Sequence, residues 1–188
     1  LIALSISSSG QMALLLAPRF GLLFRAPHSD LGGQSQRRGV LAEAPLAGGA
    51  PRELLEEVYS ADWSPDGKSL AVVRRVGGKH RLEFPTGRVL YETAILFPHI
   101  SISPSGDRVA FVSGIRNLYV TEPGGRVRDL RERVLETAWH RATNEIWFNS
   151  VAGGTTELFA VVPGRRKRRV TTLPGDFVLH DISADGRV

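Results

Sequence analysis

The chain has 188 residues and no cysteine. It therefore cannot form a disulfide, use a cysteine nucleophile or bind a metal through thiolates. This absence excludes those classes of site but does not determine the compartment in which the protein works.

The sequence also lacks a long helical pattern and a long apolar run. No segment repeats apolar residues every 3.6 positions over ten or more residues, as an amphipathic helix requires. The apolar run at residues 12–17 is far shorter than the roughly 20 residues that cross a bilayer, and we do not interpret it as a signal peptide. We therefore expect a chain that is nearly all β.

Motifs for catalysis are missing as well. The sequence contains no kinase glycine-rich loop, no His-Arg-Asp or Asp-Phe-Gly motif, and no Gly-x-Ser-x-Gly nucleophile elbow. No two of its histidines have the spacing of metal ligands. We expect no catalytic residue, no cofactor and no metal site in this chain. The histidines are His28, His80, His99, His140 and His180.

The net charge is +5, which permits anionic partners without requiring them. The strongest basic run covers residues 165–169. It could contact phosphates of nucleic acid or an anionic membrane, or it could be a solvated turn between two strands. No aromatic residue interrupts the run to stack on bases, so we do not expect nucleic-acid binding; such binding would depend steeply on salt. We expect membrane contact only through segments outside this chain. The run consists of Arg165, Arg166, Lys167, Arg168 and Arg169.

What the sequence does contain is a repeated hairpin motif. It occurs as Ser-Pro-Asp-Gly at 64–67, as Ser-Pro-Ser-Gly at 103–106 and as Ser-Ala-Asp-Gly at 183–186, with weaker copies at 5–15 and 137–148. Proline presets φ for the first central position of a turn, and glycine accepts positive φ. A short apolar run of strand length follows the turns at 64–67 and 103–106. The predicted structural turn residues are Pro65, Asp66, Gly67, Pro104, Gly106, Asp185 and Gly186.

The spacing of the turns predicts the fold. From Gly10 the successive intervals to the turn glycine, or to Thr143 in the fourth copy, are 57, 39, 37 and 43 residues, near the 40–45 residues of a four-stranded propeller blade. We attribute the long first interval to an inserted surface loop at residues 18–39. Two further strands fit in each period, although 51–55 reads equally as a strand or a helical turn. The expected units are 1–56, 57–94, 95–132, 133–174 and 175–188.

The predicted fold is therefore an all-β propeller of four-stranded antiparallel blades, incomplete, with about four blades and the start of a fifth. A β-sandwich ranks lower because it does not predict similar motifs at similar spacing. We expect further sequence after Val188 to complete the ring, because an open propeller exposes sheet edges.

The Ser-Pro-Asp-Gly hairpin followed by an apolar strand resembles the WD-repeat-like units of TolB-like propellers, of prolyl-oligopeptidase-type propeller domains and of the tricorn protease. Residues 45–54, 61–67 and 81–85 together resemble the C-terminal sensor propellers of bacterial serine/threonine protein kinases. The resemblance implies a covalently linked effector domain before Leu1 and suggests a periplasmic or other extracytoplasmic location, with a cytoplasmic one left open. The turn at 140–143 departs from the pattern, and no TolB partner-binding residue can be carried over.

Three polar residues on the strands entering the turns are candidate ligand or channel residues. Asp62 and Asp181 occupy the same repeat position, and His180 precedes the latter. Either they bond to backbone or arginine near a blade edge, or they line a channel or ligand-binding mouth. We expect the tryptophans to pack between blades.

The sequence thus favours a non-catalytic module that binds a protein, peptide or small ligand within a larger protein. The alternative is a propeller appended to a kinase or peptidase domain outside this chain.

Overall fold

The computed structural model describes residues 14–16, 20–25, 39–45, 50, 52–97, 99–114, 116–177, 179 and 182. This part of the chain contains strands and turns and no helix. The strands are β1 (Leu14–Leu16), β2 (Phe20–Arg25), β3 (Gly39–Pro45), β4 (Arg52–Trp63), β5 (Leu70–Val76), β6 (Lys79–Glu83), β7 (Val89–Thr93), β8 (Ile100–Ile102), β9 (Val109–Ser113), β10 (Asn117–Thr121), β11 (Val127–Arg133), β12 (Thr137–His140), β13 (Glu145–Ala152), β14 (Thr155–Val161) and β15 (Arg168–Pro174).

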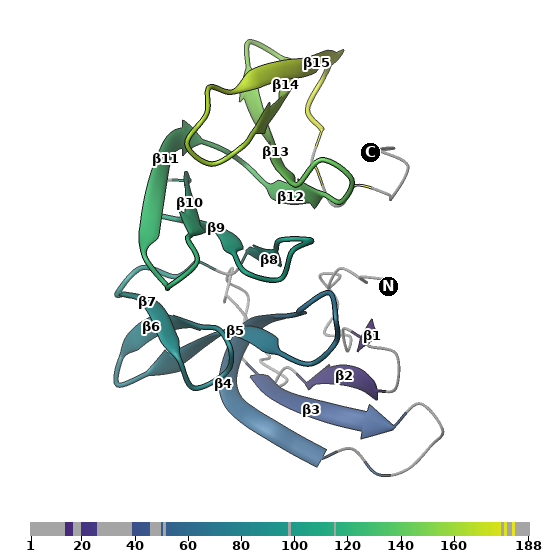
Figure 1. The fold of residues 1–188 in the computed structure, drawn as a ribbon, viewed down its shortest axis with the longest axis vertical. Coiled ribbons are helices and arrows are strands. Elements are labelled where there is room, and N and C mark those ends of the chain that lie inside the picture. Colours follow the sequence, from purple (N-terminus) through teal and green to yellow (C-terminus); the bar gives the residue numbers. More distant parts are fainter. Residues whose placement is uncertain are drawn as a thin grey trace, which may run out of the picture.

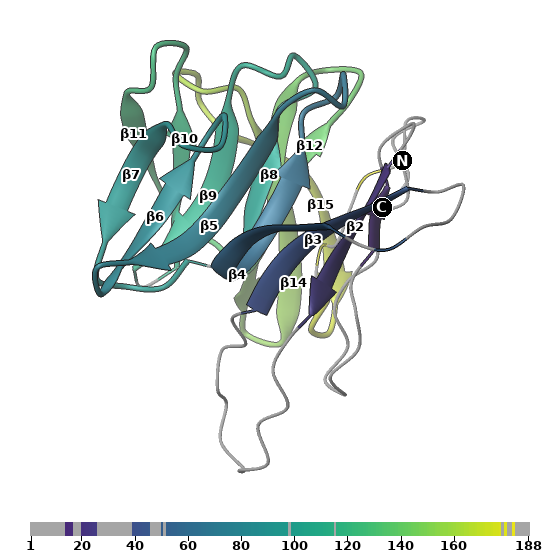
Figure 2. The same cartoon turned by 90° about the horizontal axis from the view of Figure 1, so that it is seen from below.

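The strands form antiparallel sheets in which each strand pairs with its neighbours in sequence. One sheet has seven strands, β1 to β7, and two have four strands, β8 to β11 and β12 to β15. The sheets follow one another around an arc (Figure 1), and Figure 2 shows them one behind another with their strands roughly aligned. β4, β8 and β12 contact one another in that order, whereas β7, β11 and β15 are edge strands. This is the arrangement of consecutive propeller blades.

The seven-stranded sheet is two units joined through the long strand β4. Its first half pairs with β3, where Leu41 faces Leu55, and its second half pairs with β5, where Trp63 faces Leu70. Glu57 lies between the halves with φ of 58°, and the register shifts nearby. The sequence left residues 51–55 as either a strand or a helical turn. In the structure, Arg52–Leu55 are part of strand β4. Below, unit 1 is β1–β3 with the first half of β4, unit 2 is the rest of β4 to β7, unit 3 is β8–β11, and unit 4 is β12–β15.

The expectation of a surface loop throughout residues 18–39 is wrong for Phe20–Arg25, which form β2. This strand pairs with β1, with Leu16 opposite Gly21, and with β3, with Leu23 opposite Ala42. Four large apolar residues in six give the segment strand propensity, although its arginine- and glycine-rich flanks suggested a loop. The motif copy placed around Gly10 lies outside the described residues.

The two intact motifs form the predicted turns. In unit 2 the Gly67 amide donates to the Ser64 carbonyl at 2.8 Å, the Ser69 amide donates to Ser64 Oγ at 2.9 Å, and φ of Gly67 is 67°. In unit 3 the Gly106 amide donates to the Ser103 carbonyl at 2.8 Å. The serine hydroxyl thus ties the two strands together across the turn. Asp185 and Gly186 lie outside the described residues.

The unit 4 turn is built differently, as its departure from the pattern suggests. The Asn144 amide donates to the His140 carbonyl at 2.9 Å, one residue further along than in the other turns. The Thr143 amide donates to His140 Nδ1 at 3.2 Å, so the imidazole replaces the serine hydroxyl. Asn144, with φ of 54°, takes the positive-φ role that the sequence assigned to Thr143. Asparagine tolerates this conformation better than threonine does.

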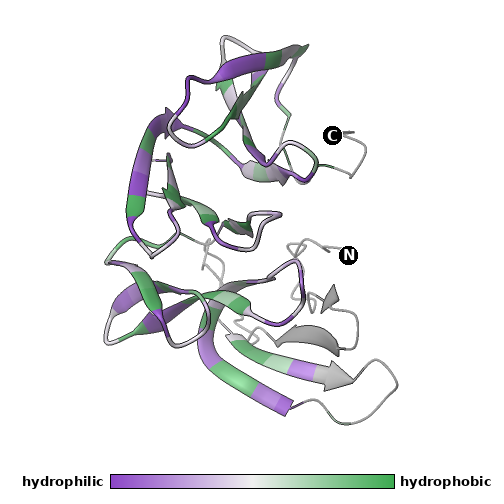
Figure 3. Cartoon of the chain, in the orientation of Figure 1, coloured by the Kyte–Doolittle hydropathy of each residue, from purple (hydrophilic) through white to green (hydrophobic). Residues whose placement is uncertain are grey.

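The core lies between neighbouring sheets. Units 2 and 3 meet through an aromatic cluster in which Phe97 and Phe111 are fully buried against Tyr91 and Tyr119. Figure 3 shows the apolar character of β5 and β9, in contrast to the polar edge strand β11. Burial of each large side chain contributes roughly 1.5–3 kcal/mol relative to exposure. The core residues between units 3 and 4 include Trp139, Ile146, Phe148, Ala110, Val112, Leu118 and Val120.

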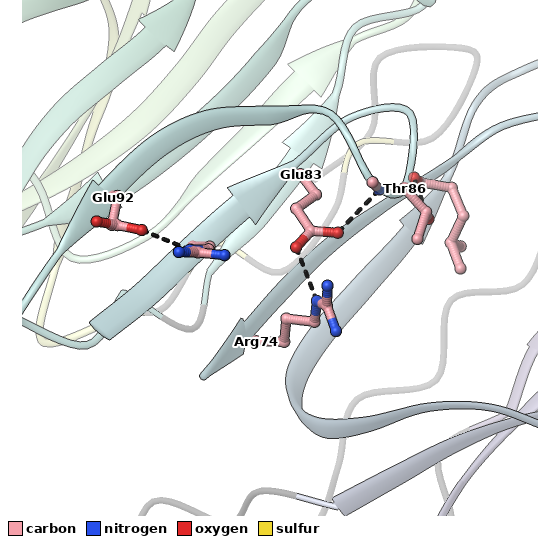
Figure 4. Close-up of polar contacts among 7 residues, drawn as sticks. Arg74, Glu83, Thr86 and Glu92 are labelled. Carbon is pink, nitrogen blue, oxygen red and sulfur yellow. Dashed lines mark hydrogen bonds and ion pairs between the residues drawn. The ribbon is translucent and has the colours of Figure 1, made fainter. Parts of the chain in front are cut away.

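A buried carboxylate stabilises unit 2. Glu83 is 1% exposed, and its Oε1 accepts from Arg74 Nε at 2.7 Å. Its Oε2 accepts from the Gly87 amide at 2.9 Å, which ties the turn between β6 and β7 to the sheet (Figure 4). Thr86 in the same turn donates to the Leu70 carbonyl at 3.0 Å. A buried charge needs such partners because an unpaired one is costly.

Candidate functional site

The candidate site lies where the first strand of each unit begins, which we call the entry end; the Ser-Pro-Asp-Gly turns lie at the opposite ends of these strands. Trp63, Ile102 and Trp139 pair with Leu70, Val109 and Ile146 at the same point of units 2, 3 and 4. Three residues earlier, the corresponding positions carry Ser60, His99 and Glu136. The repeat therefore presents a different polar side chain at one position in three consecutive units.

His99 and Glu136 meet across the boundary between units 3 and 4. His99 Nδ1 lies 3.1 Å from Glu136 Oε2, with side-chain exposures of 52% and 24%. The backbone positions the pair: the Glu136 amide donates to Asn149 Oδ1 at 3.1 Å, and Asn149 Nδ2 donates to the Phe177 carbonyl at 2.6 Å. The pair is thus anchored to β13 and remains accessible from solvent.

Arg116 completes the cluster from the turn between β9 and β10. Its carbonyl accepts from the Val134 amide at 2.8 Å, two residues before Glu136, and its side chain is exposed. Burial raises the pKa of Glu136 to about 7, although the positive charge of Arg116 acts in the opposite direction. Burial also lowers the pKa of His99. The carboxyl is therefore half-protonated near neutral pH, while the imidazole beside it stays neutral.

Asp62, a predicted ligand or channel residue, contacts the next unit. Its Oδ2 accepts from the Ile102 amide at 2.9 Å. At the following boundary, Trp139 Nε1 donates to the carbonyl of Ser101, the repeat equivalent of Asp62, at 2.9 Å. Both contacts link the first strands of neighbouring units. The other two predicted residues, His180 and Asp181, lie outside the described residues.

Ion pairs occupy much of the basic run. Lys167, Arg168 and Arg169 pair with Glu132, Glu145 and Glu157 at 2.6, 2.6 and 3.2 Å, respectively. Hydrogen bonds from Arg168 lower the pKa of Glu145 to about 2. The cations of Lys167 and Arg168 also lie over the rings of Phe159 and Trp147. The side chains of Arg165 and Arg166 are exposed.

Two findings concern other kinds of site. Among the described residues, no group of three or more His, Cys, Asp or Glu could hold a metal ion. That same part of the chain has no helix long and apolar enough to cross a membrane.

Sequence reasoning missed the His99–Glu136–Arg116 cluster. His99 was considered only for metal spacing, and Glu136 and Arg116 belong to no motif. The available signal was the repeat itself, because aligning the units on their turns places His99 and Glu136 at one position. Arg116 is brought to them by the fold.

No protein-family model matches the chain, and a search of curated proteins by sequence finds no match. Solved structures do match. TolB from Acinetobacter baumannii aligns with a TM-score of 0.66 at 20% identity, covering 89% of this chain and 45% of that one. A candidate TolB from Agrobacterium tumefaciens aligns with a TM-score of 0.59 at 23% identity, covering 81% and 58%. The fold is that of a TolB-like β-propeller.

Other propellers align less closely. A candidate 6-phosphogluconolactonase from Bacteroides uniformis has a TM-score of 0.56 at 11% identity, covering 92% of this chain and 60% of that one. The chain spans about half the length of the TolB structures that it matches. At these identities the likeness establishes the fold alone, so function has to be argued from the site.

Proposed function

We propose that this propeller is a non-catalytic binding module that takes a protein or peptide at the entry end of units 2 to 4. The observation that carries the proposal is the polar variation among Ser60, His99 and Glu136. The positions three residues later carry the packing residues Trp63, Ile102 and Trp139. Repeat scaffolds combine recurring packing positions with variable positions that contact ligands.

A finer form of the proposal concerns the larger protein. The resemblance of the Ser-Pro-Asp-Gly hairpins to sensor propellers supports a sensing role, outside the cytoplasm, for a linked effector domain. The alternative is recruitment of substrate to a linked serine/threonine kinase or prolyl-oligopeptidase-type domain. The open reading frame around the chain distinguishes them: a kinase domain and membrane span upstream favour the sensor, and a Gly-x-Ser-x-Gly domain downstream favours the peptidase.

A phage-displayed peptide library tests the binding module. Selected peptides are synthesised, and their affinity for the 188-residue chain is measured by fluorescence anisotropy. We expect His99→Ala to weaken binding at least about tenfold, the effect of losing roughly 1.4 kcal/mol. Lys68→Ala, an exposed change at the opposite end of unit 2, should leave the affinity unchanged. Failure to select any peptide that binds would refute the proposed binding function. Binding that is lost in Lys68→Ala but kept in His99→Ala would place the site at the turn end of the units and refute the proposed location.

A further inference from the structure

The contact between His99 and Glu136 can hold one proton in two ways. If Glu136 is protonated, its hydroxyl donates to His99 Nδ1, and a neutral imidazole then carries its own proton on Nε2. If Glu136 is ionised, it accepts from Nδ1–H, and Nε2 of the neutral ring becomes an acceptor. Protonation of Glu136 therefore changes His99 Nε2 from an acceptor to a donor.

The charge of the cluster changes in the same step. Arg116 contributes one positive charge. With Glu136 protonated and His99 neutral, the three side chains carry a net charge of +1; with Glu136 ionised, they carry none. Among the described residues, the charged or titratable groups at Glu136 are His99, from the segment before β8, and Arg116, from the β9–β10 turn. The β13 neighbour, Asn149, is uncharged.

The protonated form offers two donors and a positive charge, which is a combination suited to a carboxylate. The ionised form offers one fewer donor and a negative charge that repels an anion. The exposures of His99 and Arg116 leave both side chains accessible to a ligand.

We propose that His99, Arg116 and Glu136 form a carboxylate-binding site that accepts its ligand when Glu136 is protonated. The site rests on the proposed binding function and specifies the chemistry of the ligand. The carboxylate can come from the C-terminus of a peptide, from an acidic side chain or from a small organic acid. Binding takes up one proton wherever Glu136 is ionised in the free protein, and that proton goes to the Glu136 carboxylate.

Three labelled glycine-serine pentapeptides and free acetate separate these sources. One peptide has a free C-terminal carboxylate, the second is amidated, and the third is amidated with a central aspartate. Their affinities for the full chain are measured by fluorescence anisotropy at pH 6 and pH 8, with acetate as competitor. We expect one or both carboxylate peptides to bind about fivefold or more tightly at pH 6, because removing a like charge at contact distance changes an interaction by about this factor even in water. The amidated peptide should bind more weakly at both pH values.

Variants link the pH dependence to the residues. Glu136→Gln is uncharged at both pH values, so its affinity at pH 8 should approach that of the wild type at pH 6. Arg116→Gln should lose most of the binding. Arg126→Gln removes the same charge from an exposed residue at the other end of β10 and should have no effect.

Nitrogen NMR of the His99 ring gives a readout that does not depend on any ligand. The tautomer should change between pH 6 and pH 8 in the wild type and stay constant in Glu136→Gln. Equal affinity at the two pH values, equal binding of the amidated peptide, no binding of any carboxylate probe, or a constant tautomer overturns the proposal. Peptides from the library that need His99 but no carboxylate would retain the binding function while refuting this inference.

Discussion

Glu136 is a carboxyl whose surroundings disfavour its charged form. Its pKa rises from 4.5 to about 7 in the folded protein. Between these values the folded state binds a proton that the unfolded state has released, so this group makes stability fall as pH rises through the window. The loss is complete above pH 7 and amounts to up to about 3 kcal/mol.

Glu136→Gln should remove that loss. The variant should be about 1–3 kcal/mol more stable than the wild type at pH 8 and close to it at pH 4.5, as measured by urea denaturation. Glu56→Gln, the same change at an exposed position, serves as the control. A stability difference that does not vary with pH would contradict the assigned environment of Glu136.

Among the elements, the β6–β7 turn is held by the Glu83 side chain. Removing Glu83 leaves Arg74 without its buried partner and the Gly87 amide without its acceptor. Breaking a buried pair in this way costs about 3–5 kcal/mol, so Glu83→Ala should lower the urea midpoint strongly. Glu122→Ala breaks a comparable but more exposed pair with Arg128 and should cost about 0–1 kcal/mol. Similar losses in the two variants would show that Glu83 does not hold the turn.

Substitutions at two hairpin turns should change the stability of the fold in opposite directions. Asn144 has positive φ, and its Oδ1 is buried with no hydrogen-bond partner among the described residues. Asn144→Gly should therefore stabilise the fold by about 0.5–1 kcal/mol. Gly106→Val should destabilise it by about 1–2 kcal/mol, because a branched residue is strained at φ of 74°. Thermal unfolding followed by circular dichroism measures both; a destabilised Asn144→Gly would mean that the amide has an unrecognised partner.

At the scale of the whole molecule, apolar side chains are exposed beside unit 4, one of them at a position whose equivalents in the repeat are buried. Phe177 occupies the repeat position of Val58, Phe97 and Val134, which are almost fully buried, yet Phe177 is 50% exposed. Val151 and Leu173 pair with the same residue of β14, Thr156, and are also exposed. Thr156 Oγ1 accepts from the Phe177 amide, so the three apolar side chains lie close together.

Apolar groups gathered in this way favour association. The isolated chain should form oligomers with increasing concentration in sedimentation equilibrium, and Phe177→Ser should shift it toward monomer. Ile95→Ser, which alters an equally exposed apolar residue of unit 2, should leave the association unchanged. A wild type that stays monomeric at all concentrations would refute the role assigned to these side chains.

Local chemistry made much of this fold predictable. The turns at Gly67 and Gly106 follow from residues that preset φ or accept positive φ, and the apolar runs after them can only be buried as strands between sheets. The strand β2 was not predicted because its arginine- and glycine-rich flanks suggested a loop, and only its pairing with β1 and β3 reveals it. The sequence marks the turn at His140 as a departure from the pattern, but only the folded backbone decides that Asn144 is its positive-φ residue.

The sequence by itself therefore determined the repeat, the strand content and the propeller architecture, since each depends on short-range preferences and on periodicity. The likeness to TolB-like propellers came from the resemblance of the hairpin motif. The tertiary structure alone decided which side chains meet across sheets. His99, Arg116 and Glu136 lie up to 37 residues apart and have no common motif, and only the stacking of unit 4 on unit 3 brings them together. The same stacking buries Glu136 and raises its pKa. No local sequence pattern predicts this pKa shift, because desolvation depends on the neighbours that folding supplies.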